Sequence, residues 1–257
     1  MLEQRIQQHF IDSADLKYQA AQALSLPIAS AVQAMLACVT SGGKVLACGS
    51  GPSVTDAQMF ASLCVTGFER DRPELAALAL SAQGGLLGSL PVSGGGGNAQ
   101  HYLARQVRAL GQAGDLLLVL SVTGNDPCAL EAVEAAHERD MMAVVLSGRT
   151  GGTLAARMRE TDVLICVPHD RAARVREVHA LVLHCLCDGV DAQLLGEQEM
   201  PLSSSRSTVP FVPPWLLRCL AAHCLPAFRW SWVAAWSRAR WSPWTGARPA
   251  PRSKTKA

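Results

Sequence analysis

The sequence predicts an α/β fold in which a parallel sheet is covered by helices on both faces. Over residues 1–200, short apolar runs of strand type alternate with longer segments of helical spacing. The short runs are apolar at nearly every position, which is typical of strands buried on both faces. A composition of 49% hydrophobic and 17% charged residues supplies enough apolar area for one sizeable core. These three observations together favour repeated βαβ units.

Each element follows from its local pattern. Two leading helices are expected at residues 2–24 and 27–41, where Leu, Ile, Ala and Val recur at helical spacing until Gly42 and Gly43 end the second one. Strands are expected at residues 44–48, 75–80, 115–121, 142–147 and 162–167. Helices are expected at residues 54–65, 126–139 and 171–195. In such sheets ligands bind at the carboxyl ends of the strands, so the loops after strands are the candidate sites.

Two of these loops are candidates for a phosphate-binding site. The first, CGSGPS at residues 48–53, enters a helix whose N-terminus offers N–H groups and a partial positive charge to an anion. The second, SVTGND at residues 121–126, again joins a strand to a helix. An ordinary structural turn remains the alternative for each loop. The candidate phosphosugar-binding residues are Ser50, Gly51, Ser53, Ser121, Thr123 and Asn125.

The chain after residue 200 differs sharply in composition from the rest. Residues 201–257 contain nine Lys or Arg, no Asp or Glu, all six Trp and eight of the fourteen Pro. The prolines interrupt any long helix, and the apolar side chains follow neither the helical nor the alternating period. We therefore expect residues 200–257 to be a disordered basic tail, such as a shifted reading frame would produce. The alternative is an appendage that binds a membrane surface or nucleic acid.

Cysteine usage and the N-terminus indicate a cytoplasmic protein. The nine cysteines include no CxxC pair and lie mostly in apolar segments, as free thiols do. The first residues, MLEQRIQQHF, lack the basic and apolar stretches of a signal peptide. In residues 1–200 no continuous apolar run reaches the length that a membrane span needs.

Several stretches, in this order, resemble the sugar isomerase (SIS) domain family. They are CGSG and DAQMFA between residues 48 and 61, FERDRPELAALAL at 68–80, ARQVRALGQAGDLLLVLSVTGN at 104–125, LSGRTGG at 146–152 and RVREVHALVLHCLCDGVD at 174–191. The resemblance covers residues 1–199 and implies a flavodoxin-like α/β/α subunit with a five-stranded parallel sheet, assembled as a homotetramer. Within the family, the chain is most similar to the branch that contains phosphoheptose isomerases and DnaA initiator-associating proteins.

Four positions distinguish this chain from the isomerases of that branch. In the isomerases, the resemblance implies a zinc-binding His and a catalytic Glu in the helix after the first glycine loop, where this chain has Met59 and Leu63. A Gln and a His of the last helix complete that site, and the matching residues are Arg176 and His184. A thioether and an aliphatic chain cannot accept a proton, and Arg176 puts a cation where a metal ligand is needed. We therefore expect no metal, no cofactor and no catalytic residue, with His184 as the catalytic group if the protein is active.

These positions favour a non-enzymatic regulator over an enzyme. The resemblance to the DnaA initiator-associating members implies a tetramer that binds the replication initiator DnaA and retains weak phosphosugar binding, without direct contact to nucleic acid or membrane. Leu194 and Leu195 are the candidate partner contacts, with burial in the tetramer as the alternative. Val122, Asp126 and the seven glycines of residues 82–98 indicate reduced affinity for phosphosugars.

The alternative function is enzymatic. It is a phosphoheptose isomerase that converts sedoheptulose 7-phosphate to a heptose 7-phosphate for lipopolysaccharide core biosynthesis, with zinc as its cofactor.

Overall fold

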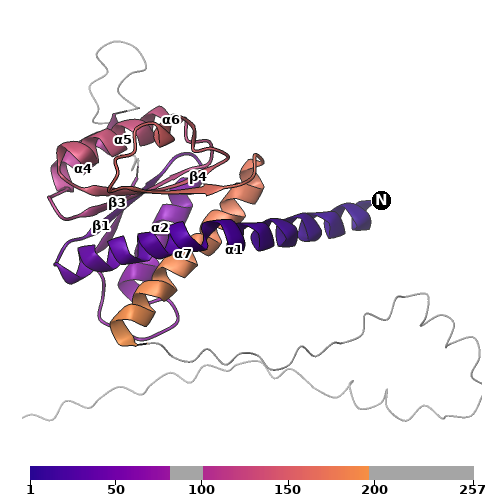
Figure 1. The fold of residues 1–257 in the computed structure, drawn as a ribbon, viewed down its shortest axis with the longest axis horizontal. Coiled ribbons are helices and arrows are strands. Elements are labelled where there is room, and N and C mark those ends of the chain that lie inside the picture. The colour runs from indigo at the N-terminus through magenta and orange to yellow at the C-terminus, as the bar shows by residue number, and fades with distance from the viewer. Residues whose placement is uncertain (82–100, 197–257) are drawn as a thin grey trace, which may run out of the picture. The chain divides into compact units, whose positions relative to one another are not determined.

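The computed structural model describes residues 1–81 and 101–196, which form a sheet between two layers of helices (Figure 1). All five strands are parallel and lie in the order β2-β1-β3-β4-β5. Each predicted strand forms within two residues of its expected bounds. The strands are β1 (Val45–Gly49), β2 (Ala77–Leu80), β3 (Leu116–Ser121), β4 (Met142–Gly148) and β5 (Val163–Val167). The chain moves outward from β1 to β2 and then returns to β3, so the strand order reverses between β1 and β3.

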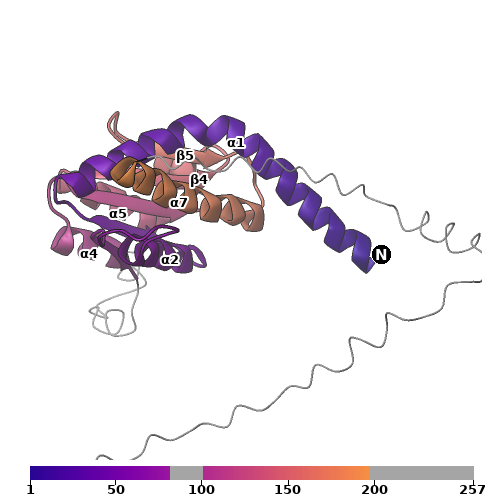
Figure 2. The same cartoon turned by 90° about the horizontal axis from the view of Figure 1, so that it is seen from below.

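Two hydrophobic cores lie on the two faces of the sheet. One core packs beneath α1 (Leu2–Thr40), α2 (Ser53–Thr66) and α7 (Ala172–Leu195), and the other beneath α4 (Tyr102–Leu110), α5 (Pro127–Glu138) and α6 (Gly152–Ala155), as Figures 1 and 2 show. Leu118 faces the first core and Leu117 the second, and both are buried. Alternate side chains of a strand point to opposite faces, so a strand covered on both sides is apolar throughout. The edge strand β2 differs, because Leu78 is 46% exposed.

The expectation of two leading helices is wrong, because residues 2–40 form the single helix α1 with Pro27 inside it. Proline removes one backbone hydrogen bond and bends a helix, but it does not have to end one. Here the helix is held after the proline by burial, since Ala31, Val32 and Met35 pack into the first core. Figure 2 shows the result, a continuous but bent α1.

Helices α1 and α7 are long and apolar enough to cross a membrane by length and composition. The same property is found in helices that pack on a sheet, and both of these helices contribute side chains to the first core. The seven cysteines of the described residues are free thiols. The glycine-rich segment 82–98 and the tail 201–257 lie outside the described residues.

Candidate functional site

The two predicted phosphate loops meet where the strand order reverses. The β1 loop, residues 49–53, and the β3 loop, residues 121–126, leave the carboxyl ends of neighbouring strands. The Ser50 N–H donates to the carbonyl of Leu120 at 3.3 Å, which joins the start of one loop to the end of the adjacent strand. This edge is the position at which doubly wound sheets bind their ligands.

The β1 loop is a tight turn that leads into α2. Gly51 has a φ of +53°, a conformation that side-chain-bearing residues rarely adopt. The amides of Ser53, Val54 and Thr55 donate back to Ser50, Gly51 and Pro52, so these N–H groups of the first turn are already used. The Ser53 hydroxyl, in contrast, is buried without a hydrogen-bond partner in the described part of the chain. A buried hydroxyl left unpaired is costly, which is consistent with a group that meets a ligand or water at this point.

The β3 loop is held by its own side chains and by the loop after β4. Ser121 Oγ accepts from the Gly124 amide at 3.2 Å, and Thr123 Oγ1 accepts from the Asn125 amide at 3.3 Å. Asn125 Oδ1 accepts from the Thr153 amide at 2.9 Å. Gly124 has a φ of +69°, and a Cβ at this position would lie 1.9 Å from the carbonyl oxygen of Gly151. Thr123 and Asn125 remain exposed on this preformed loop, while Ser121 is buried beneath it.

An ion pair connects α7 to the β1 loop. Arg176 Nε and Nη2 donate to the two carboxylate oxygens of Asp56 at 2.9 Å each, and Nη2 also donates to the carbonyl of Pro52 at 3.1 Å. Asp56 lies in the first turn of α2, directly after the loop. The hydrogen bond to Asp56 raises the pKa of Arg176 above its ordinary value, so the guanidinium stays charged. Sequence inspection singled out Arg176 but missed its partner, because nothing in the local pattern connects residues 120 positions apart.

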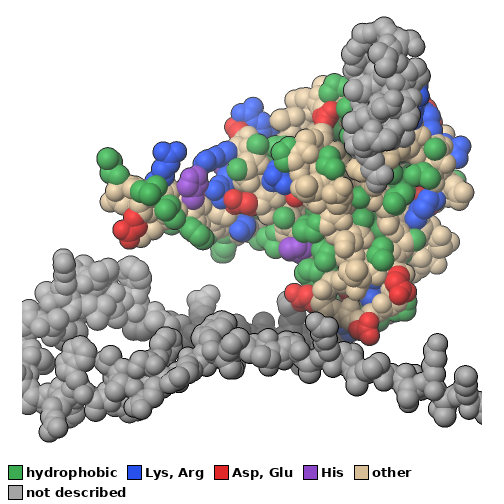
Figure 3. Space-filling model, turned by 180° about the vertical axis from the view of Figure 1, so that it is seen from behind, with side chains coloured by type: hydrophobic (Ala, Val, Ile, Leu, Met, Phe, Trp, Pro, Cys, Tyr) green, Lys and Arg blue, Asp and Glu red, His purple; other side chains and the backbone are tan. Residues whose placement is uncertain are grey.

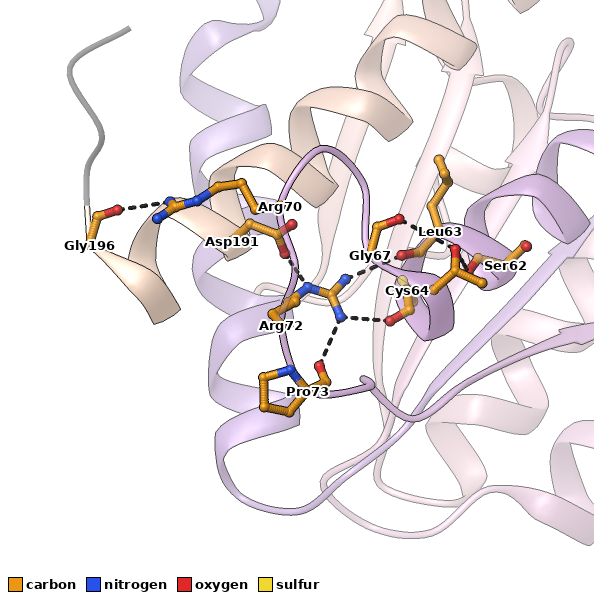
Figure 4. Close-up of polar contacts among 10 residues, drawn as sticks. Ser62, Leu63, Cys64, Gly67, Arg70, Arg72, Pro73, Asp191 and Gly196 are labelled. Carbon is orange, nitrogen blue, oxygen red and sulfur yellow. Dashed lines mark hydrogen bonds and ion pairs between the residues drawn. The ribbon is translucent and has the colours of Figure 1, made fainter.

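Met59 and Leu63 lie on the side of α2 that packs against the first core. The backbone of the same turn is fixed by Arg72, which donates to the carbonyls of Leu63 and Cys64 at 3.2 and 2.8 Å and pairs with Asp191 of α7 (Figure 4). Arg72 and Asp191 are both buried, so they lock the end of α2 onto α7. Neither Met59 nor Leu63 has a charged or hydrogen-bonding side chain with which to bind a ligand.

Two histidines of α7 have different surroundings. His179 is buried, its Nε2 lies 3.2 Å from the carbonyl of Ser147, and burial lowers its pKa to about 4. It is therefore neutral near pH 7, and its Nδ1 has no partner among the described groups. His184 is half-buried and stacks on Phe68 with ring centroids 5.1 Å apart. His184 is thus the imidazole of α7 that retains access to solvent.

Comparison with known proteins identifies the family. The family model of the SIS domain matches residues 8–148, which is more than half of the chain. The chain belongs to the SIS domain family. Its five-stranded parallel sheet and flanking helices confirm the fold that the resemblance implied.

Several of the similar proteins are named phosphoheptose isomerase. The chain is 57% identical over 200 residues to the phosphoheptose isomerase of Methylibium petroleiphilum, and this match covers 78% of this chain and 98% of the relative. It is 47% identical over 200 residues to the phosphoheptose isomerase of Azoarcus sp., and that match covers 76% of this chain and 98% of the relative. The structure of the phosphoheptose isomerase GmhA from Neisseria gonorrhoeae superposes with a TM-score of 0.69 at 42% identity, over 75% of this chain and all of that one. A phosphoheptose isomerase from Francisella tularensis gives 0.68 at 38% identity, over 74% and 98%.

These relatives correct the functional expectation. The prediction of a non-enzymatic regulator that binds DnaA is wrong, because relatives at 44–57% identity over most of the chain are named phosphoheptose isomerase. The prediction gave too much weight to a few site positions against the similarity of the whole domain. Leu194 and Leu195, 38% and 40% exposed at the end of α7, therefore have no assigned partner.

The SIS domain positions that the resemblance assigns to zinc do not fit a zinc ion in this chain. Zinc in proteins takes Cys, His, Asp or Glu ligands in tetrahedral arrangement. Met59 supplies no such atom, and the Arg176 guanidinium carries a positive charge and already binds Asp56. Within residues 1–81 and 101–196, no three His, Cys, Asp or Glu side chains gather in a way that holds a metal. His184 alone cannot form the site.

Proposed function

We propose that this protein is a phosphoheptose isomerase that binds a sugar phosphate at the carboxyl edge of its sheet. The observation that carries the proposal is 57% identity over nearly the whole length of a relative of that name. The β1 and β3 loops support it, because Ser50, Ser53, Thr123 and Asn125 offer hydroxyl and amide donors at the point where the strand order reverses. The substrate of the proposed reaction is sedoheptulose 7-phosphate.

The phosphate is proposed to bind at the two loops. The unpaired hydroxyl of Ser53 and the exposed side chains of Thr123 and Asn125 supply donors. The N-terminus of α2 adds a partial positive charge, although the amides of its first turn are already bonded within the turn. We therefore expect affinity to depend more on side-chain donors than on the backbone of the loop.

Ketose–aldose isomerisation moves a proton between neighbouring carbon atoms, which requires a group that can accept and return it. Of the four positions that the resemblance relates to catalysis, only His184 carries such a group. It lies eight residues beyond Arg176 on α7, which is about 12 Å along the helix. That length is comparable with an extended seven-carbon sugar phosphate whose phosphate is held at the β1 loop. We propose His184 as the proton-transferring group, and we expect slow turnover because Leu63 stands where the resemblance implies the catalytic Glu.

Turnover by the full chain tests this proposal. Purified protein is incubated with sedoheptulose 7-phosphate and the product is followed by NMR. The test variant is His184→Asn. The control is His101→Asn, because His101 is a part-exposed histidine on the α4 side of the sheet. We expect conversion above the protein-free blank, its loss in His184→Asn and its retention in His101→Asn. Conversion no faster than the blank would overturn the proposed function. Equal rates in both variants would overturn the role of His184.

We further propose that the protein assembles as a homotetramer through the N-terminal part of α1. This part of the helix carries exposed apolar side chains, visible in Figure 3, that the subunit itself leaves uncovered. They are Leu2, Ile6, Phe10, Ile11 and Tyr18. Light scattering at micromolar concentration tests the assembly, and a monomer would contradict it.

A further inference from the structure

Asp56 creates an electrostatic problem for the proposed phosphate site. Its carboxylate lies in the first turn of α2, three residues after Ser53 and beside the loop that is proposed to hold the phosphate. The side chain is 14% exposed, so water screens its charge only weakly. A phosphate monoester carries between −1.5 and −2 charges at pH 7. Left alone, Asp56 would repel the ligand of this loop.

Arg176 removes that repulsion. It reaches from α7 across the start of α2, holds both carboxylate oxygens of Asp56 at 2.9 Å and binds the carbonyl of Pro52 inside the β1 loop at 3.1 Å. A guanidinium that binds a carboxylate bidentately is fixed in direction as well as in charge. Its side chain remains 33% exposed, so Arg176 is partly accessible from solvent. The charges of Asp56 and Arg176 also act on the pKa of His179, whose Nε2 lies 3.2 Å from the carbonyl of Ser147 in β4.

We infer that Arg176 is a binding-determining residue of this site, whose fixed guanidinium neutralises Asp56 and allows the β1 loop to accept a phosphate dianion. The inference rests on the proposed binding of a sugar phosphate and adds the group on which its affinity depends. It also explains how the chain can keep an anion site although Met59 and Arg176 stand where the resemblance implies zinc ligands. Sugar-phosphate binding is then independent of zinc.

Calorimetric titration of the full chain with sedoheptulose 7-phosphate, and separately with inorganic phosphate, tests the inference. The variants are Arg176→Gln, Arg176→Lys, Asp56→Asn and the double variant Arg176→Gln/Asp56→Asn. Arg108→Gln is the matched control, because Arg108 holds Glu138 with two hydrogen bonds on the α4–α5 side of the sheet, away from the β1 loop. Each titration is run with and without a chelator, the zinc content is measured by mass spectrometry, and thermal unfolding checks that each variant is folded.

We expect Arg176→Gln to weaken binding of both ligands about tenfold or more, with Arg176→Lys in between, since a Lys keeps the charge but not the bidentate contact. Asp56→Asn should bind at least as tightly as the natural chain, and the double variant should recover most of the loss. The loss in Arg176→Gln should shrink at high salt, because screening weakens the repulsion from Asp56. Chelator and Arg108→Gln should leave the affinity unchanged.

Three results would overturn the inference: Arg176→Gln binding as tightly as the natural chain, a double variant as weak as Arg176→Gln, or affinity that disappears with removal of stoichiometric zinc. The first would show that Arg176 is dispensable, and the second that it acts only by shaping the loop. Failure of the proposed function looks different. Binding without turnover contradicts the isomerase and leaves this inference intact, whereas absence of binding by the natural chain contradicts both.

Discussion

Removal of one partner of the buried pair between Arg72 and Asp191 is expected to destabilise the described domain strongly. Arg72 follows α2 and Asp191 lies near the end of α7, and their side chains are only 1% and 2% exposed. Besides Asp191, the guanidinium donates to the carbonyls of Cys64, Pro73 and Leu63 (Figure 4). The second carboxylate oxygen of Asp191 is buried without a partner among the described residues. Arg72→Met would thus leave a buried carboxylate with no compensating charge.

The size of the effect follows from this geometry. Removing one partner of a buried ion pair costs about 3–5 kcal/mol, because the remaining charge stays desolvated. The lost hydrogen bonds at the end of α2 act in the same direction. For a domain of this size, about 4 kcal/mol corresponds to a fall of about 10 °C in the melting temperature. In the double variant Arg72→Met/Asp191→Leu no charge is left buried, and we expect it to recover most of the loss.

Urea and thermal denaturation of the full chain, followed by circular dichroism, test this prediction. Arg70→Met is the matched control, since Arg70 makes a single exposed hydrogen bond to the carbonyl of Gly196 at 2.9 Å in the same region. Its effect should stay within about 0.5 kcal/mol. The reasoning is refuted if Arg72→Met loses less than about 1 kcal/mol of unfolding free energy, or if the double variant is no more stable than the single one.

Three further predictions concern the pH response, the β3 loop and the tail. Burial lowers the pKa of His179 to about 4, below its unfolded value of 6.5, so the unfolded state binds more protons than the folded state between these pH values. The free energy of unfolding should therefore fall by up to about 3 kcal/mol as the pH drops from 6.5 to 4. Urea titrations should show a flatter pH profile for His179→Gln, and an unchanged slope would contradict the assignment. Gly124→Ala should abolish phosphosugar binding in calorimetry, because its Cβ would overlap the Gly151 carbonyl, and normal affinity would show that the loop adapts. Truncation after Met200 should raise the soluble yield and leave the melting temperature unchanged, and a truncated chain that does not fold would show that the tail is needed.

Much of the fold could be predicted from the sequence because strand and helix patterns are local. All five strands and the helices α2, α5 and α7 were expected within two residues of their bounds, since buried parallel strands are apolar at each position and helices repeat at 3.6 residues. The loops after β1 and β3 were expected at the ligand edge for the same reason. The break at Pro27 was wrong, because burial of α1 against the sheet outweighs the local cost of a proline.

The similarity of the whole domain, more than single positions, supports the functional proposal. The side chains of Met59, Leu63 and Arg176 led to the prediction of a DnaA-binding regulator, and the relatives named phosphoheptose isomerase contradict that prediction. The side chains at a few positions limit what chemistry a site can perform, and they do not identify the function of the protein by themselves.

The sequence by itself determined the five strands, the helices α2, α5 and α7, the two candidate loops and the apolar faces that form the cores, but not the continuity of α1 or the helices α4 and α6. Only the tertiary structure decided which charges meet, because Arg72 and Asp191 are 119 residues apart and Arg176 and Asp56 are 120 residues apart. Secondary structure depends on the repeat of neighbouring residues, which a sequence displays directly. Pairing of buried charges depends on how α2 and α7 pack on the sheet, and that packing exists only after the whole chain has folded.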